Sequence, residues 1–159
     1  MNAQLSMNAE PARPADALAF YMHGLELARN VGDIHEEGKN ALGVVWATTV
    51  LRTVEAAAIG HEALLRLVDN RHWSLIWIAT EIVASHLFFE SNIEAAALIY
   101  GHLEAHHPAW GGEHGRVRAL QRLRKQPGAE QWLARGASMT DDEVVALVLD
   151  RLVQHAPVG

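Results

Sequence analysis

The sequence predicts an all-α fold, a right-handed α-solenoid of helix pairs with about seven to eight helices and a C-terminal capping helix. Three observations predict this architecture. The run from Trp73 to Phe89, WSLIWIATEIVASHLFF, is apolar on every side, which is typical of a helix buried all round. Signals for helix N-termini recur along the chain, whereas no alternating apolar run bounded by turns indicates a strand. A histidine-centred pattern also returns at the spacing of a helix pair.

Composition and charge limit what the chain can be. Its 159 residues are half apolar and one fifth charged, which suits a single domain with its own core; we place it at residues 15–155, after a disordered lead at 1–14. The lack of cysteine excludes disulfides, thiolate zinc sites and cysteine nucleophiles, and it fits a reducing compartment. A net charge of −6 argues against direct binding of nucleic acid. No secretion signal is visible, so a cytoplasmic location is expected.

The first half of the chain contains three predicted helices before the central one. The first covers about residues 15–30, where the helical apolar spacing ends. Asp33 opens the second, about residues 33–53, and Glu36 completes a capping box with it. The two glycines inside this helix are expected to mark close contacts with other helices. The third helix covers about residues 56–68.

The central helix, residues 73–89, carries the polar residues that need the most explanation. It is short for a membrane span and includes Glu81 and His86, so no membrane is expected. These two residues lie five apart and so do not share a helix face. Each is expected to cap or pair with a neighbouring helix rather than to act as an acid or base. On that interpretation, leucine should be tolerated at Glu81.

The second half of the chain continues the helical pattern. Ser91 and Glu94 form a capping-box pattern, and the helix that they open ends before Pro108. A glycine-rich turn at 109–115 precedes a basic amphipathic helix at 116–125. Five cations in this helix could contact phosphates, but no aromatic residue interleaves them. A solvated face that pairs with acidic residues is therefore favoured over a nucleic-acid surface.

The C-terminal region closes with two more predicted helices. A short helix through Trp132 ends at Gly136. Thr140 and Glu143 form a further capping box and open the terminal helix, whose acidic first turn suits the helix dipole. This terminal helix is the one expected to cap the array.

An internal repeat links the helices into pairs. His23, His61 and His102 occupy the same place in three successive pairs and lie 38 and 41 residues apart. Periods of this size with two helices per unit are typical of tetratricopeptide-like (TPR-like) solenoids. A repeated position favours a packing role. If these histidines converge on the concave face, they would instead bind a partner, with Trp110 of the glycine-rich turn as an exposed anchor.

The histidines before and after Pro108 raise the question of a metal. His102 and His106 lie one turn apart, and His114 from the next turn could supply a third ligand for zinc or nickel. The order H-E-x-x-H of a zinc hydrolase is missing, and partly exposed histidines near a helix end are the alternative. We therefore assign no metal, cofactor or catalytic residue, and keep these three as the metal candidates.

The run WLARGASMTDDEVVALVL from Trp132 resembles the end of the helical-repeat region in large actinobacterial regulators of the LuxR-type and AfsR/SARP-like group. The matching positions are a tryptophan, a glycine–alanine pair, a Met–Thr cap and an acidic turn: Trp132, Gly136, Ala137, Met139, Thr140, Asp142 and Glu143. Those regulators carry a STAND-type ATPase core, and some carry a nucleotide-cyclase or DNA-binding domain. The resemblance covers about residues 15–152 and implies a sensor module, but no phosphate-binding loop G-x-x-x-x-G-K-[ST] is present.

These observations favour a non-catalytic module for protein–protein interaction in signalling, which binds a protein or peptide on its concave face. The resemblance implies a regulator ATPase or a DNA-binding protein as that partner. The alternative is a small-ligand sensor, in which a pocket between repeats binds a small apolar effector. A metal enzyme built on the histidine-rich turn is least favoured, because no nucleophile, base and orienting group can be placed together from the sequence.

Overall fold

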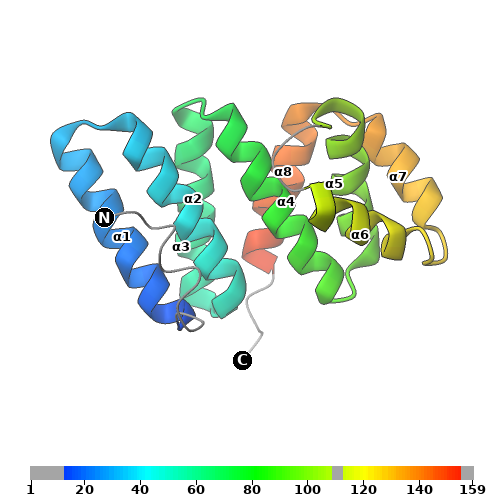
Figure 1. Ribbon diagram of the computed structural model, residues 1–159, viewed down its shortest axis with the longest axis horizontal. Helices are drawn as coiled ribbons and strands as arrows, with labels where there is room; N and C mark the ends of the chain where they lie inside the picture. The colour runs from blue at the N-terminus through cyan, green and yellow to red at the C-terminus, as the bar shows by residue number, and fades with distance from the viewer. Residues whose placement is uncertain (1–12, 109–112, 155–159) are drawn as a thin grey trace.

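The computed structural model describes residues 13–108 and 113–154, with side chains except at 113–115 and 154, and in these residues it is all-helical. Figure 1 shows the helices lying side by side along the long axis of the molecule. Within the described ranges there are eight of them: α1 (Pro14–Val31), α2 (Ile34–Leu51), α3 (Val54–Asp69), α4 (Trp73–Phe89), α5 (Ile93–His106), α6 (Glu113–Leu123), α7 (Ala129–Ala137) and α8 (Asp141–Gln154). The predicted all-α class is confirmed. Of the predicted disordered lead at 1–14, residues 1–12 lie outside the described residues.

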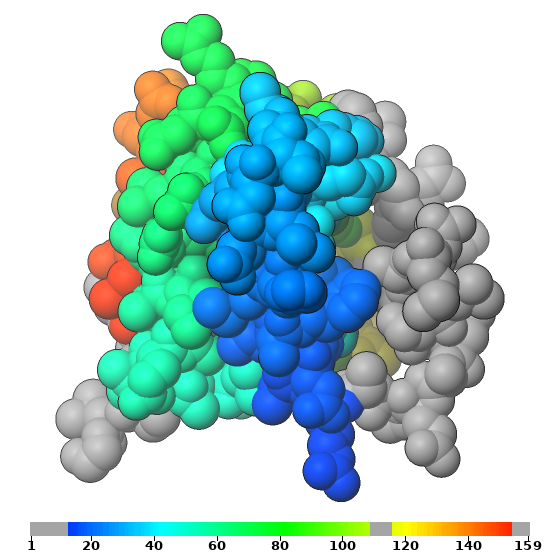
Figure 2. All heavy atoms as spheres, turned by 90° about the vertical axis from the view of Figure 1, so that its left-hand side faces the viewer, coloured from blue at the N-terminus to red at the C-terminus, as the bar shows by residue number. Residues whose placement is uncertain are grey.

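The order of the helices in space differs from their order in the chain. α1 and α2 form one end and α7 lies at the other, and Figure 2 looks onto the first end with α1 in front. α8 returns from α7 to the middle, where it contacts α3, α4 and α5 (Figure 1). A strictly linear array has contacts between neighbouring repeats only. The solenoid of TPR-like pairs, and the capping role of the last helix, therefore stay predictions.

Side-chain caps define the starts of α2, α3, α5 and α8. Asp33 accepts a hydrogen bond from the backbone N–H of Glu36 at 3.0 Å, as the sequence predicts. At α8 the capping box is reciprocal, because Glu143 N–H donates to Thr140 Oγ1 and Thr140 N–H donates to Glu143 Oε2, at 3.3 and 2.7 Å. The capping box predicted from Ser91 is wrong by one residue. Asn92 caps α5 instead, since its side chain accepts from Ala95 N–H at 3.4 Å.

α4 is buried along most of its length, as predicted. No residue from Leu75 to Phe88 is exposed, whereas the ends are, with Trp73 at 44% and Phe89 at 69% exposure. α5 is buried even more completely, because every residue from Ala95 to Leu103 is buried. The burial of α5 is hard to predict from its sequence, since alanine and glycine contribute little to an apolar pattern. None of the described helices is long and apolar enough to cross a membrane.

Glycines allow the helices to approach closely. A side chain at Gly38 would meet Leu75, and one at Gly43 would meet the ring of Tyr21, so the predicted role of the two α2 glycines is confirmed. The tightest contact lies between α5 and α7. There, a Cβ atom on Gly101 or on Gly136 would collide with a backbone carbonyl oxygen of the facing helix. Backbone atoms cannot rotate away, so this helix pair requires glycine on both sides.

We expect Gly136→Ala to lower the free energy of unfolding by about 1–3 kcal/mol, because the added methyl group forces α5 and α7 apart. Urea unfolding measures the change. Gly24→Ala is the matched control, since its methyl group would meet only the side chain of Asn40, which can move. Alanine is the better helix former, so that control should be near neutral or stabilising. Equal stability of the two variants would contradict the proposed close contact.

Candidate functional site

Histidines at the end of α5 lie against the turn between α7 and α8. His102 is buried, with 1% exposure, and its Nδ1 atom lies 3.0 Å from the carbonyl oxygen of Met139. His106, one turn further on, lies with Nε2 at 2.8 Å from the carbonyl oxygen of Ala137. A carbonyl oxygen only accepts hydrogen bonds, so Nδ1 of His102 and Nε2 of His106 each carry a proton. These tautomers are inferred from the hydrogen-bond partners. The turn after α7 is thus attached to α5 by two imidazoles.

Two of the histidines meet one carboxylate at the start of α8. Nε2 of His102 lies 2.9 Å from Asp141 Oδ1, and Nε2 of His107 lies 3.3 Å from the same oxygen. All three atoms fall within 4.8 Å of one another. His102 is buried, His107 is partly buried, and half of the Asp141 side chain is exposed. We call His102, His107 and Asp141 the histidine cluster.

Aromatic rings enclose the cluster on the side of α4. The ring of Trp77 stacks on His107, with centroids 3.9 Å apart and planes at 21°, and it lies 5.7 Å from the ring of His102. Trp73 stacks on Trp77 at 6.2 Å. Burial lowers the pKa of His102, although the hydrogen bond to Asp141 acts in the opposite direction. His102 is therefore shielded from solvent, whereas the cluster is accessible at Asp141 and, to a smaller extent, at His107.

A buried ion pair lies next to the cluster. Arg116 of α6 is only 7% exposed, and it donates to Glu81 Oε2 at 2.6 Å and to the carbonyl oxygen of His107 at 2.8 Å. The predicted pairing of Glu81 with another helix is confirmed. The prediction that the basic helix presents a solvated face is wrong for Arg116, which is buried. Tyr100 is also buried here, and desolvation with the charge of Glu81 raises its pKa to about 12. Tyr100 stays neutral at physiological pH.

A separate groove runs between α1 and α3 with α2 as its floor. Its volume is about 440 Å³, and we call it the α1–α3 groove. Glu62 and Arg66 pair at 2.8 Å on one side, and the hydrogen bond and charge of Arg66 lower the pKa of Glu62. Arg29 on the opposite side contributes to the same effect. The groove is lined by Met22, His23, Leu25, Glu26, Arg29, Val44, Ile59, Glu62, Ala63 and Arg66.

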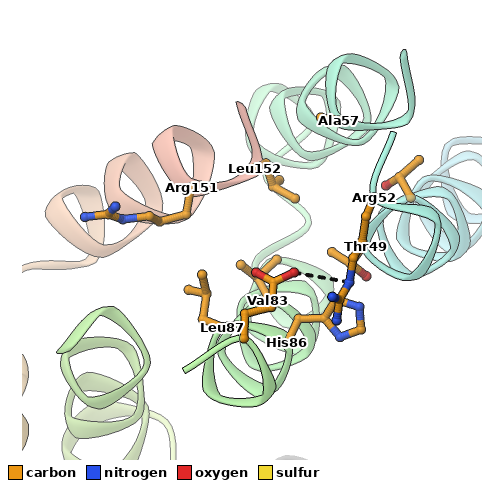
Figure 3. Close-up of a pocket in the computed structure, with 10 residues that line it drawn as sticks. Thr49, Arg52, Ala57, Val83, His86, Leu87, Arg151 and Leu152 are labelled. Atoms are coloured by element: carbon orange, nitrogen blue, oxygen red, sulfur yellow. Dashed lines mark ion pairs between the residues drawn. The ribbon is translucent and has the colours of Figure 1, made fainter. Parts of the chain in front are cut away.

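A smaller hollow lies between α2, α3, α4 and α8 (Figure 3). Its volume is about 30 Å³, which matches the share of one water molecule in the liquid. The ion pair of Arg52 with Glu90, at 3.1 Å, lies at its side, and His86 is among the lining residues. The hollow is too small for an organic ligand.

The structure separates the residues that the repeat placed together. His23 is exposed and lines the α1–α3 groove, His61 is partly buried outside the lining of that groove, and His102 is buried under α8. The equivalent sequence positions therefore have different surroundings. Trp110 and the side chain of His114 lie outside the described residues.

The metal candidates are also rearranged. His106 lies against Ala137 rather than Asp141, and His107 takes the place beside His102. His107 is the residue after α5, with φ of −133°, so its side chain is not bound by helical spacing. Asp141 is 39 residues away from His102 in the chain, and no sequence pattern connects the two. Its only sequence signal is membership of the acidic first turn of α8.

Comparison with known proteins assigns the chain to no family. No model of a protein family, no curated protein and no solved structure matches the chain. The resemblance of the C-terminal run to actinobacterial regulators therefore stays a prediction.

We expect Glu81→Leu to lower the free energy of unfolding by about 3 kcal/mol, because it leaves the guanidinium of Arg116 buried without its carboxylate. The earlier expectation that leucine is tolerated does not fit the burial of Arg116. Glu104→Leu is the matched control. It removes the exposed pair with Arg124, at 3.1 Å, and should cost at most about 1 kcal/mol. Equal unfolding curves for the two variants would refute this assignment.

Proposed function

We propose that the chain is a non-catalytic helical-repeat module that binds a segment of a protein partner in the α1–α3 groove. The observation that supports this is the composition of the groove, which has an apolar base and charged rims supplied by α1 and α3. Leu25 and Val44 line its base as buried side chains, Ile59 is partly exposed, and Met22 beside them is 43% exposed. Apolar surface left open between polar rims is typical of an interaction site.

The charges at the rim indicate the chemistry of the partner. Arg29 pairs with Glu37 at 3.2 Å and Arg66 pairs with Glu62 at 2.8 Å, so both cations already have a carboxylate. Glu26 forms no ion pair within the described part of the chain. The whole chain carries a net charge of −6. The groove therefore suits an apolar segment flanked by basic residues.

The proposed place in the cell follows the resemblance of the C-terminal run. On that basis, the module acts in signalling or transcriptional regulation in the cytoplasm, and its partner is a regulator ATPase or a DNA-binding protein. Binding of such a partner requires no catalytic residue in this chain. The groove chemistry is independent of this resemblance, so the groove can be tested without the partner's identity.

A small apolar effector is the second candidate ligand. The groove volume of about 440 Å³ lies in the range of small-molecule sites, roughly 300–1,000 Å³. An effector bound there would link α1 to α3 and raise the melting temperature, as any ligand of the folded state does. Apolar dyes and aromatic fragments test this alternative in a thermal-shift screen.

The decisive experiment uses defined peptides. Fluorescein-labelled 15-residue peptides with apolar cores and basic flanks, and the same peptides with acidic flanks, are titrated with the full chain at two salt concentrations. We expect the basic set to bind, and Glu26→Lys and Ile59→Glu to weaken binding about tenfold or more, as expected when a central contact is lost. Higher salt should weaken it as well.

Glu55→Lys is the matched control, because Glu55 is an exposed residue of α3 outside the groove lining. It changes the net charge as Glu26→Lys does and should leave peptide binding unchanged. If Glu26→Lys and Glu55→Lys weaken peptide binding equally, the change in net charge alone explains the effect, and the groove site is contradicted. Absence of binding by every peptide would also refute the proposal.

A further inference from the structure

The histidine cluster has the atoms of a metal site, and it lies apart from the α1–α3 groove. We propose that His102, His107 and Asp141 bind a divalent transition-metal ion of the zinc class, which links the C-terminal end of α5 to the first turn of α8. The ligand atoms are Nε2 of each histidine and Oδ1 of the aspartate. Imidazole and carboxylate together are a common ligand set for zinc.

The distances in the cluster fit one shared ion. Zinc lies about 2.0–2.2 Å from nitrogen and oxygen ligands, so two ligands of a tetrahedral site are about 3.3 Å apart. The two histidine nitrogens lie 2.9 and 3.3 Å from Asp141 Oδ1, and all three atoms are within 4.8 Å of one another. Seating one ion among them requires the half-exposed Asp141 side chain and the partly buried His107 ring to turn toward it.

The tautomer of His102 is the second observation. Its Nδ1 atom faces the carbonyl oxygen of Met139 at 3.0 Å and must donate a proton to it. In the neutral ring, Nε2 then carries a lone pair, and this lone pair faces the oxygen of Asp141 at 2.9 Å. Two acceptors at this distance need a cation between them. A metal ion supplies it, and a histidine that donates Nδ1–H to a backbone carbonyl while Nε2 binds metal is a usual arrangement.

A second proton on His102 is the competing solution, because an imidazolium would donate to both partners. The 1% exposure of the side chain opposes that charge, although Asp141 favours it. In this case the cluster is only a buried ion pair and has no use for zinc. The experiment below separates the two solutions.

Charge and access also favour a cation. The first turn of α8 contains Asp141, Asp142 and Glu143, which make the opening negative. Half of the Asp141 side chain and 18% of the His107 side chain are exposed, so an ion can enter from solvent. Three protein ligands leave a fourth position for water. His106 is no ligand here, because its Nε2 donates to Ala137.

Zinc binding is tested with the full chain. The protein is treated with chelator, dialysed, and titrated with ZnCl₂ by isothermal titration calorimetry. We expect one zinc per chain and a melting temperature that rises with zinc concentration. Asp141→Asn and His107→Gln should each weaken binding by about tenfold or more, with unchanged far-UV circular dichroism. Co²⁺ in place of zinc should give the strong visible absorption of a tetrahedral site in the wild type and not in these two variants.

The controls decide which histidines matter. His106→Gln, and His35→Gln at an exposed position of α2, should bind zinc as the wild type does. No stoichiometric binding would refute the site and leave the imidazolium pair. Zinc binding that survives both Asp141→Asn and His107→Gln would also refute it. Loss of zinc binding in His106→Gln alone would refute this ligand set in favour of His102, His106 and His114. The site shares no residue with the α1–α3 groove, so peptide binding and zinc binding can fail separately.

Discussion

The close approach of α5 and α7 is the constraint on which the C-terminal half depends. Gly101 and Gly136 each lie against a backbone carbonyl of the other helix, so the two helices cross with no side chain between them. Because α7 ends one residue later, its closing turn lies directly beside the last turn of α5. The carbonyl oxygens of Ala137 and Met139 then come within hydrogen-bonding distance of His106 and His102. The direction in which α8 leaves, and with it the position of Asp141, follows from this contact.

The two candidate sites differ in how their polar groups are placed. Around α5, the groups that need partners find them, as Arg116 does with Glu81 and His107. Around α1, Met22 and Glu26 remain accessible in a groove. α8 contacts α3 as well as α5. An ion in the histidine cluster would hold the start of α8 and leave the groove chemistry unchanged, so we treat the two sites as separate functions of one fold.

The sequence predicts the helices well where the signal is local. Asp33 and Thr140 define helix starts because a cap and its partner lie three residues apart. Ser91 and Asn92 are both good caps, and the pattern alone chose the wrong one; Ser91 lies at φ of 64°, outside the helix. The all-round apolar character of α4 predicts burial correctly, while the alanines and glycine of α5 conceal a helix that is buried more completely.

The candidate sites depend on tertiary contacts, which local patterns do not contain. Helical spacing pairs His102 with His106, but His107 turns back after the helix ends and takes the place beside Asp141. The repeat groups His23 with His102. Of these two histidines, only His102 is buried beneath α8. Arg116 belongs to a basic stretch that looks solvated until α4 supplies Glu81. In each case the missing information is which helix lies opposite.

The ring tautomer of His102 tests the central claim most directly, because it reports whether the turn after α7 lies against α5. A long-range ¹H–¹⁵N correlation spectrum of the chelator-treated chain, recorded at about pH 8, well above the ordinary histidine pKa of about 6.5, distinguishes the two ring nitrogens. The contact with the Met139 carbonyl predicts a proton on Nδ1. A neutral His102 that carries its proton on Nε2 and none on Nδ1 would contradict this contact, and with it the arrangement of α5, α7 and α8 described above.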